Sequence, residues 1–249
     1  MQDAIIVVPC FNEEKRLPVA PFLSLTKAAR LLFVDDGSRD GTAQVLASLV
    51  AQGKGRVEYM ALAQNLGKAE AVRQGMVRAA KSGADFVGFA DSDLATPVEE
   101  LERLLATAGE SAAQVVLGSR VGLAGMQVER KLARHYAGRI FATAASVVLH
   151  ARFYDTQCGA KIFKNTPLLR SALSTPFRSR WIFDVELLGR MLAGTLEEAG
   201  IPENAFLEVP LRRWVDVAGS KLRLSSWLRA AVDLGLISAD LSQRRRRRR

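Results

Sequence analysis

The feature that most constrains this chain is an alternation, over its first half, of short apolar runs with stretches of helical character. The apolar runs cover residues 4–8, 31–34, 57–60, 86–89 and 115–117. Runs of this length that are closed by turn residues predict buried strands. Because these strands alternate with helices, the sequence predicts an α/β fold with a Rossmann-like, mostly parallel sheet and helices on both faces.

Carboxylates and an arginine follow three of the predicted strands. Asp35 and Asp36 come after the second run, Asp91 and Asp93 after the fourth, and Arg120 shortly after the fifth. The carboxyl ends of parallel strands meet at one edge of a sheet, where open α/β sheets bind ligands. Carboxylate oxygens suit hard cations such as Mg²⁺, and the guanidinium fork of arginine suits phosphate oxygens. We therefore expect a metal and nucleotide site at this edge.

Some of these polar residues also suit a purely local structural role. Asp93 precedes a predicted helix and Asp40 precedes another, so both suit the start of a helix. Asp36 and Asp91 have no such local role. Lys68 follows a glycine in front of a helix, but the G-x-x-x-x-G-K-[ST] spacing of an ATP-binding loop is absent. Lys68 is therefore either a contact of a nucleotide or an ordinary surface lysine.

The length and composition of the chain suit one large domain. It has 249 residues, of which 49% are hydrophobic and 24% are charged. We expect a domain over residues 1–220, an amphipathic helix over 221–243 and a basic tail over 244–249. The tail supplies six of the 35 lysines and arginines, so that 29 basic residues face 26 acidic ones elsewhere. This near balance gives no reason to expect nucleic acid as a partner.

The arginine tail itself is open to several readings. It can be a solvated end, an addition made for expression, a nucleic-acid arm or an anchor for anionic lipid. The two cysteines, Cys10 and Cys158, are far apart, and no signal peptide precedes the first predicted strand. We therefore expect no disulfide framework and a cytoplasmic protein.

Two stretches in the second half have the pattern of amphipathic helices. Over residues 130–152 the pattern places on one face Leu132, Tyr136, Ile140, Phe141, Val147 and Val148. This stretch is either a helix packed on the domain or an interfacial helix with its apolar face in lipid. A second stripe covers residues 222–238. No stretch has the about 18 uncharged apolar residues that a spanning helix needs, so we expect a peripheral contact with a membrane.

The motifs at the predicted strand ends resemble glycosyltransferase family 2. The resemblance rests on Val8-Pro9 with Asn12-Glu13, Asp35-Asp36-Gly37-Ser38, Asp91-Ser92-Asp93 and Gly118-Ser119-Arg120. Within that family, three further runs look like the dolichyl-phosphate β-glucosyltransferases, relatives of the dolichyl-phosphate mannose synthases. These runs are D-T-Q-C-G-A-K-I-F at 155–163, W-I-F-D-V-E at 181–186 and G-S-K at 219–221. The resemblance covers roughly residues 4–238. One departure is Ala160, where those enzymes carry a large aromatic residue.

The resemblance implies a GT-A fold, a nucleotide-sugar donor, a divalent metal (Mg²⁺ or Mn²⁺) and inversion at the anomeric carbon. Asp36 would contact the nucleoside, Asp91 the nucleotide sugar and Asp93 the metal, while Arg120 and Arg134 would hold the acceptor phosphate. The other residues assigned to the donor are Pro9, Asn12, Glu13, Asp35, Gly37, Ser38, Lys68 and Ser92. The other residues assigned to the acceptor are Gln157, Trp181, Asp184 and Lys221.

The leading functional expectation is transfer of glucose from UDP-glucose to a polyprenyl or dolichyl phosphate. The reaction would take place on the cytoplasmic face of an anionic membrane. One alternative is a mannose synthase that uses GDP-mannose, and another is a family 2 enzyme with a soluble saccharide acceptor and Asp184 as its base. A remote alternative is a nucleic-acid-binding module that uses the arginine tail.

Overall fold

The computed structural model describes residues 2–128, 132–215 and 224–247, and it describes the backbone alone at 132–137, 224–228 and 247. A seven-stranded sheet forms the centre, with strand order β3-β2-β1-β4-β7-β5-β8. The strands are β1 (Ala4–Cys10), β2 (Arg30–Asp35), β3 (Val57–Ala61), β4 (Phe86–Ala90), β5 (Val115–Ser119), β7 (Ala160–Lys164) and β8 (Phe206–Pro210). Two short strands, β6 (Gln127–Val128) and β9 (Arg213–Trp214), pair beside this sheet.

All neighbouring strands of the large sheet are parallel except at β7, which runs antiparallel to both β4 and β5. The predicted mostly parallel α/β fold is therefore confirmed. In the register of β7, Ala160 pairs with Ala90, the last residue of β4. Because β7 begins where β4 ends, the loop that enters β7 lies at the same edge of the sheet as Asp91.

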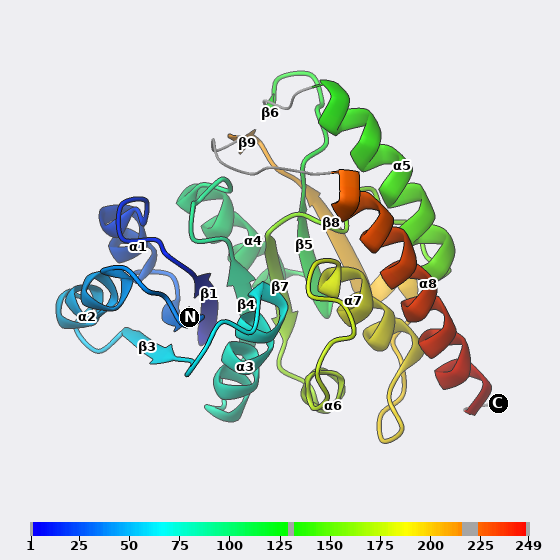
Figure 1. Ribbon diagram of the computed structural model, residues 1–249, viewed down its shortest axis with the longest axis horizontal. Helices are drawn as coiled ribbons and strands as arrows, with labels where there is room; N and C mark the ends of the chain where they lie inside the picture. The colour runs from blue at the N-terminus through cyan, green and yellow to red at the C-terminus, as the bar shows by residue number, and fades with distance from the viewer. Residues whose placement is uncertain (1, 129–131, 216–223, 248–249) are drawn as a thin grey trace.

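Helices cover both faces of the sheet (Figure 1). One face carries α3 (Lys68–Lys81), α5 (Leu132–Leu149), α6 (Pro167–Leu173), α7 (Phe183–Ala193) and α8 (Leu224–Arg247). The other carries α1 (Val19–Leu25), α2 (Thr42–Gln52) and α4 (Val98–Glu110), and a short 3-10 turn, η1 (Glu203–Ala205), precedes β8. In β1, Ile5 and Val7 face the first layer while Ile6 and Val8 face the second. Burial on both faces explains why the strands are apolar throughout instead of alternating with polar residues.

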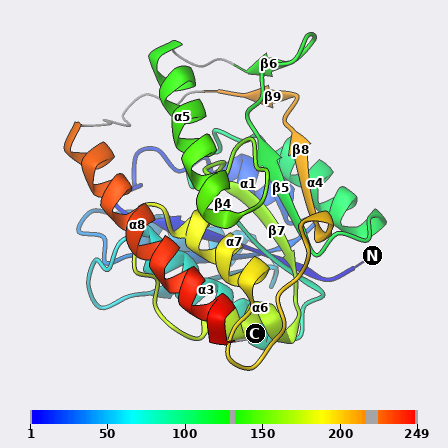
Figure 2. The ribbon, with the colours of Figure 1, turned by 90° about the vertical axis from the view of Figure 1, so that its right-hand side faces the viewer.

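Helices α5 and α8 lie side by side on the outside of α7 (Figure 2). Phe141 and Val148 of α5 pack against the core, whereas Ile140 and Val147 are 73% and 70% exposed. The expectation that these four residues share one face is therefore wrong. Adjacent helical residues point about 100° apart, so a helix that packs on its neighbours separates each of these pairs. The side chains of Leu132 and Tyr136 lie outside the described residues.

Helix α8 buries Ala230, Leu234, Ile237 and Leu241, and it continues through the arginine run to Arg247. This differs from the expected separate tail at 244–249. Arg244 Nε pairs with Asp240 Oδ2 at 2.6 Å, and Arg245 Nη2 donates to Leu149 O at 2.7 Å. Part of the arginine run thus contacts the domain. Among the described residues, no helix combines the length and the apolar character that crossing a membrane requires.

Candidate active site

A cavity of about 310 Å³ opens at the carboxyl ends of β1, β2 and β4, beside the start of α3. Seven residues predicted from the sequence line it: Pro9, Glu13, Asp36, Lys68, Asp91, Ser92 and Asp93. The cavity is also lined by Cys10, Phe11, Asn65 and Gly67. Cys10 and Phe11 were missed although they lie between two predicted residues, Pro9 and Asn12. Their only signal was this position, because neither side chain carries a charge.

Asp36 fixes the backbone turn that precedes α3. Its two carboxylate oxygens accept hydrogen bonds from the backbone N–H groups of Leu66, at 2.7 Å, and Gly67, at 2.9 Å. Gly67 has a φ of +94°, which favours glycine. Burial raises the pKa of Asp36, and the two backbone hydrogen bonds oppose that rise. Asp36 therefore shapes the cavity wall, and its contact with a nucleoside stays a prediction.

Four other predicted residues, outside the cavity lining, tie the ends of β1 and β2 together. Ser38 N donates to Asp35 Oδ1 at 3.0 Å, and Asn12 N donates to Ser38 Oγ at 2.9 Å. Between them, Gly37 has a φ of +68°, and a Cβ there would lie 2.6 Å from the backbone nitrogen of Asn65. These residues support the loops at the cavity, and their contact with a donor stays a prediction.

The acidic pair after β4 meets a lysine from α3. Lys68 Nζ lies 2.5 Å from Asp91 Oδ1, so this lysine pairs with a cavity carboxylate although its side chain is 46% exposed, and its contact with a nucleotide stays a prediction. Burial works against its charge, but Asp91 and Asp184 outweigh this effect and raise the pKa of Lys68. Asp93 Oδ1 accepts a hydrogen bond from Ala95 N at 3.0 Å. Burial, with the charge of Asp91 adding to it, raises the pKa of Asp93.

The donor set around Asp93 fits a divalent cation that shares its ligands with a substrate. Glu13 Oε1 accepts from Arg16 Nη2 at 2.8 Å and from Ser92 Oγ at 3.2 Å. Glu13 Oε2 is buried and has no hydrogen-bond partner in the described part of the chain. Among the described residues, no three His, Cys, Asp or Glu side chains gather closely enough to enclose a metal. Mg²⁺ typically takes one or two carboxylates, substrate phosphates and water, which this site can accommodate.

Gly159, in the loop before β7, contacts both the backbone and the side chain of Asp91. Asp91 N donates to Gly159 O at 3.1 Å, and a Cβ at position 159 would lie 2.1 Å from Asp91 Oδ2. No real side chain approaches that closely, so position 159 must be glycine for Asp91 to keep its orientation. The close approach explains the glycine of the D-T-Q-C-G run in physical terms.

Gly159→Ala is therefore expected to displace Asp91 and to weaken binding of the nucleotide-sugar donor that the resemblance implies. Overpacking typically costs about 1–3 kcal/mol, which corresponds to about tenfold to hundredfold in affinity. Calorimetric titration with UDP-glucose measures this change. Gly122→Ala is the matched control, because a Cβ there meets no atom within 4 Å. If the Gly159 variant and the control bound the donor equally well, the orientation of Asp91 would not depend on a glycine at position 159.

Arg120, a predicted acceptor residue, follows β5 and lies outside the cavity lining. Arg120 forms two hydrogen bonds with Asp155, from Nε to Oδ2 at 2.7 Å and from Nη2 to Oδ1 at 2.8 Å. Asp155 is held in turn by its backbone N–H, which donates to Glu208 Oε1 at 2.6 Å. The structure therefore places Arg120 in an internal ion pair, within electrostatic range of Asp91. Lys221 and the side chain of Arg134 lie outside the described residues.

Three further predicted residues are Gln157 in the loop before β7, Trp181 in the loop before α7 and Asp184 in the first turn of α7. Asp184 is buried, and Lys161 Nζ lies 2.7 Å from its Oδ1, while Gln157 Nε2 lies 3.4 Å from its Oδ2. Trp181 is 54% exposed. Sequence reasoning missed Lys161, although a lysine inside an otherwise apolar strand is itself a signal of a buried partner.

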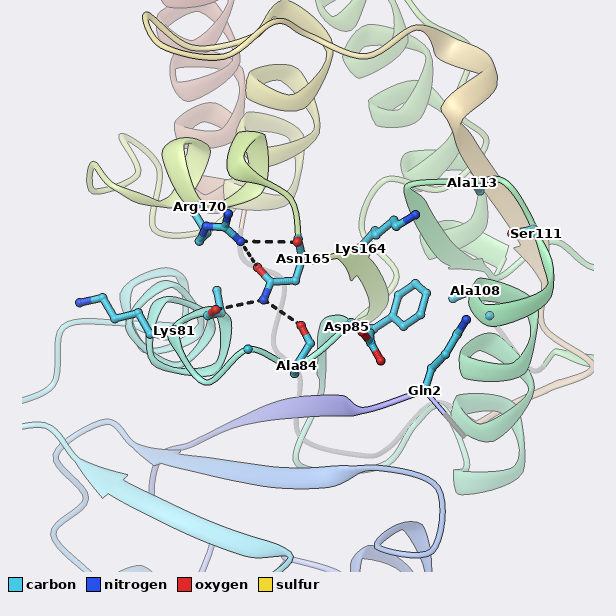
Figure 3. Close-up of a pocket in the computed structure, with 14 residues that line it drawn as sticks. Gln2, Lys81, Ala84, Asp85, Ala108, Ser111, Ala113, Lys164, Asn165 and Arg170 are labelled. Carbon is cyan, nitrogen blue, oxygen red and sulfur yellow. Dashed lines mark hydrogen bonds between the residues drawn. The ribbon is translucent and has the colours of Figure 1, made fainter.

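A larger hollow, of about 750 Å³, lies at the other end of the strands, where β1 and β4 begin and β7 ends (Figure 3). Lys81, Asp85, Lys164 and Arg170 line it, and Arg170 donates to Asn165. None of the described residues predicted for the site lies there. Seven of the predicted residues therefore line the smaller cavity, and none of the described ones lines the larger hollow.

The chain is similar to known proteins over most of its length. Residues 5–176 match the family described as Glycosyl transferase family 2. The dolichyl-phosphate beta-glucosyltransferase of Drosophila melanogaster is 33% identical over 251 residues, which are 93% of this chain and 73% of that protein.

Two solved structures have the same GT-A fold. S. aureus TarS 1-349 in complex with UDP aligns with a TM-score of 0.53 and 17% identity, covering 98% of this chain and 70% of that one. The mannosyltransferase PcManGT from Pyrobaculum calidifontis, in complex with GDP-Man and Mn2+, aligns with a TM-score of 0.55 and 15% identity, covering 97% and 64%.

Proposed function

Because this chain belongs to glycosyl transferase family 2 and is a hexosyltransferase, we propose that it transfers glucose from UDP-glucose to the phosphate of a polyprenyl lipid such as dolichyl phosphate. The observation that carries the proposal is the cavity where Lys68, Asp91 and Asp93 converge at the end of β4. The name of the Drosophila relative supports glucose and dolichyl phosphate, and the UDP complex of a structure with the same fold supports the nucleotide.

The cavity has a suitable group for each part of the donor. The nucleoside would lie against Phe11 and the wall shaped by Asp36. The diphosphate would lie near Lys68 and the start of α3, because a helix N-terminus and a cation both favour phosphate. Asp93 would hold Mg²⁺ or Mn²⁺, a role supported by the Mn2+ in the PcManGT complex. When bound, the metal supplies positive charge that stabilises the leaving diphosphate.

In the proposed reaction, an oxygen of the lipid phosphate attacks C1 of glucose. The new bond joins that oxygen to C1, the bond between C1 and the UDP oxygen breaks, and UDP leaves with the electron pair. A phosphate is ionised near neutral pH, so the attacking oxygen needs no general base. Arg120, and Arg134 by the resemblance, would orient the lipid phosphate, and orientation of this kind lowers the barrier. Asp184, which is buried and pairs with Lys161, is then not needed as a base.

The proposal is tested with purified protein, polyprenyl phosphate, Mg²⁺ or Mn²⁺, and labelled UDP-glucose and GDP-mannose in parallel. We expect glucosyl-phosphate lipid from UDP-glucose. Product from GDP-mannose alone would replace the proposed donor, and transfer to soluble saccharides alone would replace the proposed acceptor.

The lipid acceptor requires contact with a membrane, and the outer surface of α5 and α8 offers apolar side chains for it. Ile140 and Val147 of α5 and Val232 and Leu236 of α8 are all at least half exposed. Arg229 of α8 is exposed, whereas the Arg139 guanidinium of α5 lies 3.8 Å from the centroid of the Tyr154 ring. We propose that this surface meets an anionic membrane, with the apolar side chains in the interface and Arg229 near the headgroups.

Replacing both Ile140 and Val147 with aspartate is expected to weaken binding to vesicles that contain anionic lipid. Burying these two side chains contributes about 1.5–3 kcal/mol each, so the loss should be at least tenfold and should persist at high salt. Vesicle sedimentation at low and high ionic strength measures it. Leu196→Asp is the matched control, because Leu196 is 77% exposed but lies in the loop after α7. Equal losses in the double variant and the control would remove this surface as the membrane contact.

A further inference from the structure

Lys161 is a charged residue in the centre of the sheet. It belongs to β7, between β4 and β5, and its side chain is 0% exposed. Its ammonium donates to Cys158 O at 2.6 Å and to Asp184 Oδ1 at 2.7 Å, and it lies 5.2 Å from the centroid of the Phe89 ring. A lysine is rarely buried to this extent without a paired carboxylate, so the pair with Asp184 is what permits this position.

Asp184 connects this buried cation to the cavity. It lies in the first turn of α7 and interacts electrostatically with Lys68 and Asp91, and its second oxygen lies near the Gln157 amide. Charges of alternating sign thus lead from the sheet to the donor site: Lys161, Asp184, Lys68 and Asp91. The two carboxylates balance the two ammonium groups, so each charge in the series depends on its neighbours.

We propose that Lys161 is a positioning residue for the donor site, which fixes Asp184 and through it keeps Lys68 aligned with Asp91. The inference rests on the proposed donor site and deepens it. A pair that only stabilised the core could be replaced by apolar side chains with little loss. Asp184, however, also interacts electrostatically with Lys68 of the cavity. Apolar side chains in place of Lys161 and Asp184 would remove this interaction.

The titration of Asp184 provides a readout of this coupling. The charged groups that face it are Lys161 from β7, Lys68 from α3 and Asp91 from the end of β4. Burial raises the pKa of Asp184, and the two lysines oppose the rise. Without the Lys161 charge, the pKa of Asp184 must rise further. The carboxyl would then stay protonated to a higher pH than in the wild type, and Lys68 would lose part of the negative charge around it.

Lys161→Met tests the proposal, because methionine keeps most of the volume and removes the charge. We expect at least a tenfold higher KM for UDP-glucose near neutral pH. We also expect the acid limb of the kcat profile to move to higher pH, with activity partly recovered as the pH is raised further. Lys164→Met is the matched control: it lies on the same strand, with its side chain exposed at the opposite hollow (Figure 3).

A measurement of stability tests the Lys161–Asp184 coupling without any substrate. A carboxyl whose pKa is raised in the folded state takes up protons on folding, so its favourable contribution is present at low pH and is lost as the pH rises through the folded pKa. Lys161→Met should therefore cost more stability in urea unfolding at about pH 8 than at about pH 5. Adding Asp184→Asn should remove this difference, because the titrating group is then gone.

The two tests separate the possible failures. A pH-independent loss of stability in Lys161→Met would overturn the coupling to Asp184. The expected stability pattern together with an unchanged KM and an unchanged pH profile would make the pair structural and would overturn the positioning role. If the wild-type protein used no nucleotide sugar, the proposed function would fail. The positioning role would then be decided by calorimetric titration with UDP, in which equal affinity of Lys161→Met and Lys164→Met would overturn it.

Discussion

Asp93→Asn is expected to lower the rate of glucose transfer by about a hundredfold to a thousandfold, the largest effect that we predict for the site. Asp93 is the carboxylate proposed to hold the divalent cation, and an amide is a poorer ligand for a hard ion. Its Oδ1 also accepts the Ala95 N–H, a hydrogen bond that an amide oxygen can retain. The backbone after β4 should therefore keep its shape while the charge is lost.

Two measurements separate the charge from the fold. Turnover is measured with UDP-glucose and polyprenyl phosphate, and UDP-glucose affinity is measured by calorimetry with and without Mn²⁺. In the wild type the metal should tighten donor binding, and in Asp93→Asn this gain should disappear. Asp85→Asn is the control, because Asp85 precedes the same strand at its other end. Near wild-type turnover of Asp93→Asn at limiting metal would remove Asp93 from the metal site.

Arg190→Met is expected to lower the free energy of unfolding by about 3–5 kcal/mol, the largest effect on stability, because it leaves a buried charge without its partner. The side chains of Arg190 and Glu186 are only 3% and 1% exposed, and Arg190 Nη2 lies 2.7 Å from Glu186 Oε1. The guanidinium also donates to the carbonyls of Ala172, Thr175 and Pro176, between 2.7 and 2.8 Å. Methionine would remove the donor from all three carbonyls and from Glu186 Oε1, whereas Glu186 Oε2 would keep the backbone N–H of Arg178.

Urea unfolding followed by circular dichroism measures this loss. Arg178→Met is the control, since Arg178 pairs with Asp240 but its side chain is 53% exposed. An exposed pair of this kind is worth about 0–1 kcal/mol. If Arg190→Met lost no more stability than Arg178→Met, the buried pair would not hold α7 against the end of α6.

The parts of the fold that follow from local pattern could be predicted from the sequence. The apolar runs became strands β1 to β5, and Asp91 and Asp93 lie at a cavity because they follow a buried parallel strand. The place of β7 could not be predicted in this way. Its apolar run does not reveal that it enters between β4 and β5 in the antiparallel direction, because strand pairing depends on contacts between distant segments.

Side-chain partners that lie far apart in the sequence were also beyond prediction. Arg120 was expected to hold the acceptor phosphate, and its ion pair with Asp155, 35 positions later, did not follow from the local pattern. The apolar face of α5 was misassigned because periodicity alone does not show which neighbours a helix packs against. The same limit applies to Lys161, whose partner Asp184 lies on a different element.

The position of β7 also constrains how the chain can be made. In the sheet, β5 pairs with β7 and β8 but not with β4. A growing chain that has emerged only as far as β5 therefore contains no strand with which β5 pairs in the folded sheet. In the same chain β4 is an edge strand with unpaired backbone groups, which can associate with other chains. Once β7 follows, it fills that edge and brings Gly159 beneath Asp91 in the same event. The pairing of β7 with β4 thus closes this edge and positions the residue beside Asp91 together, before α7, β8 and α8 are added to the domain.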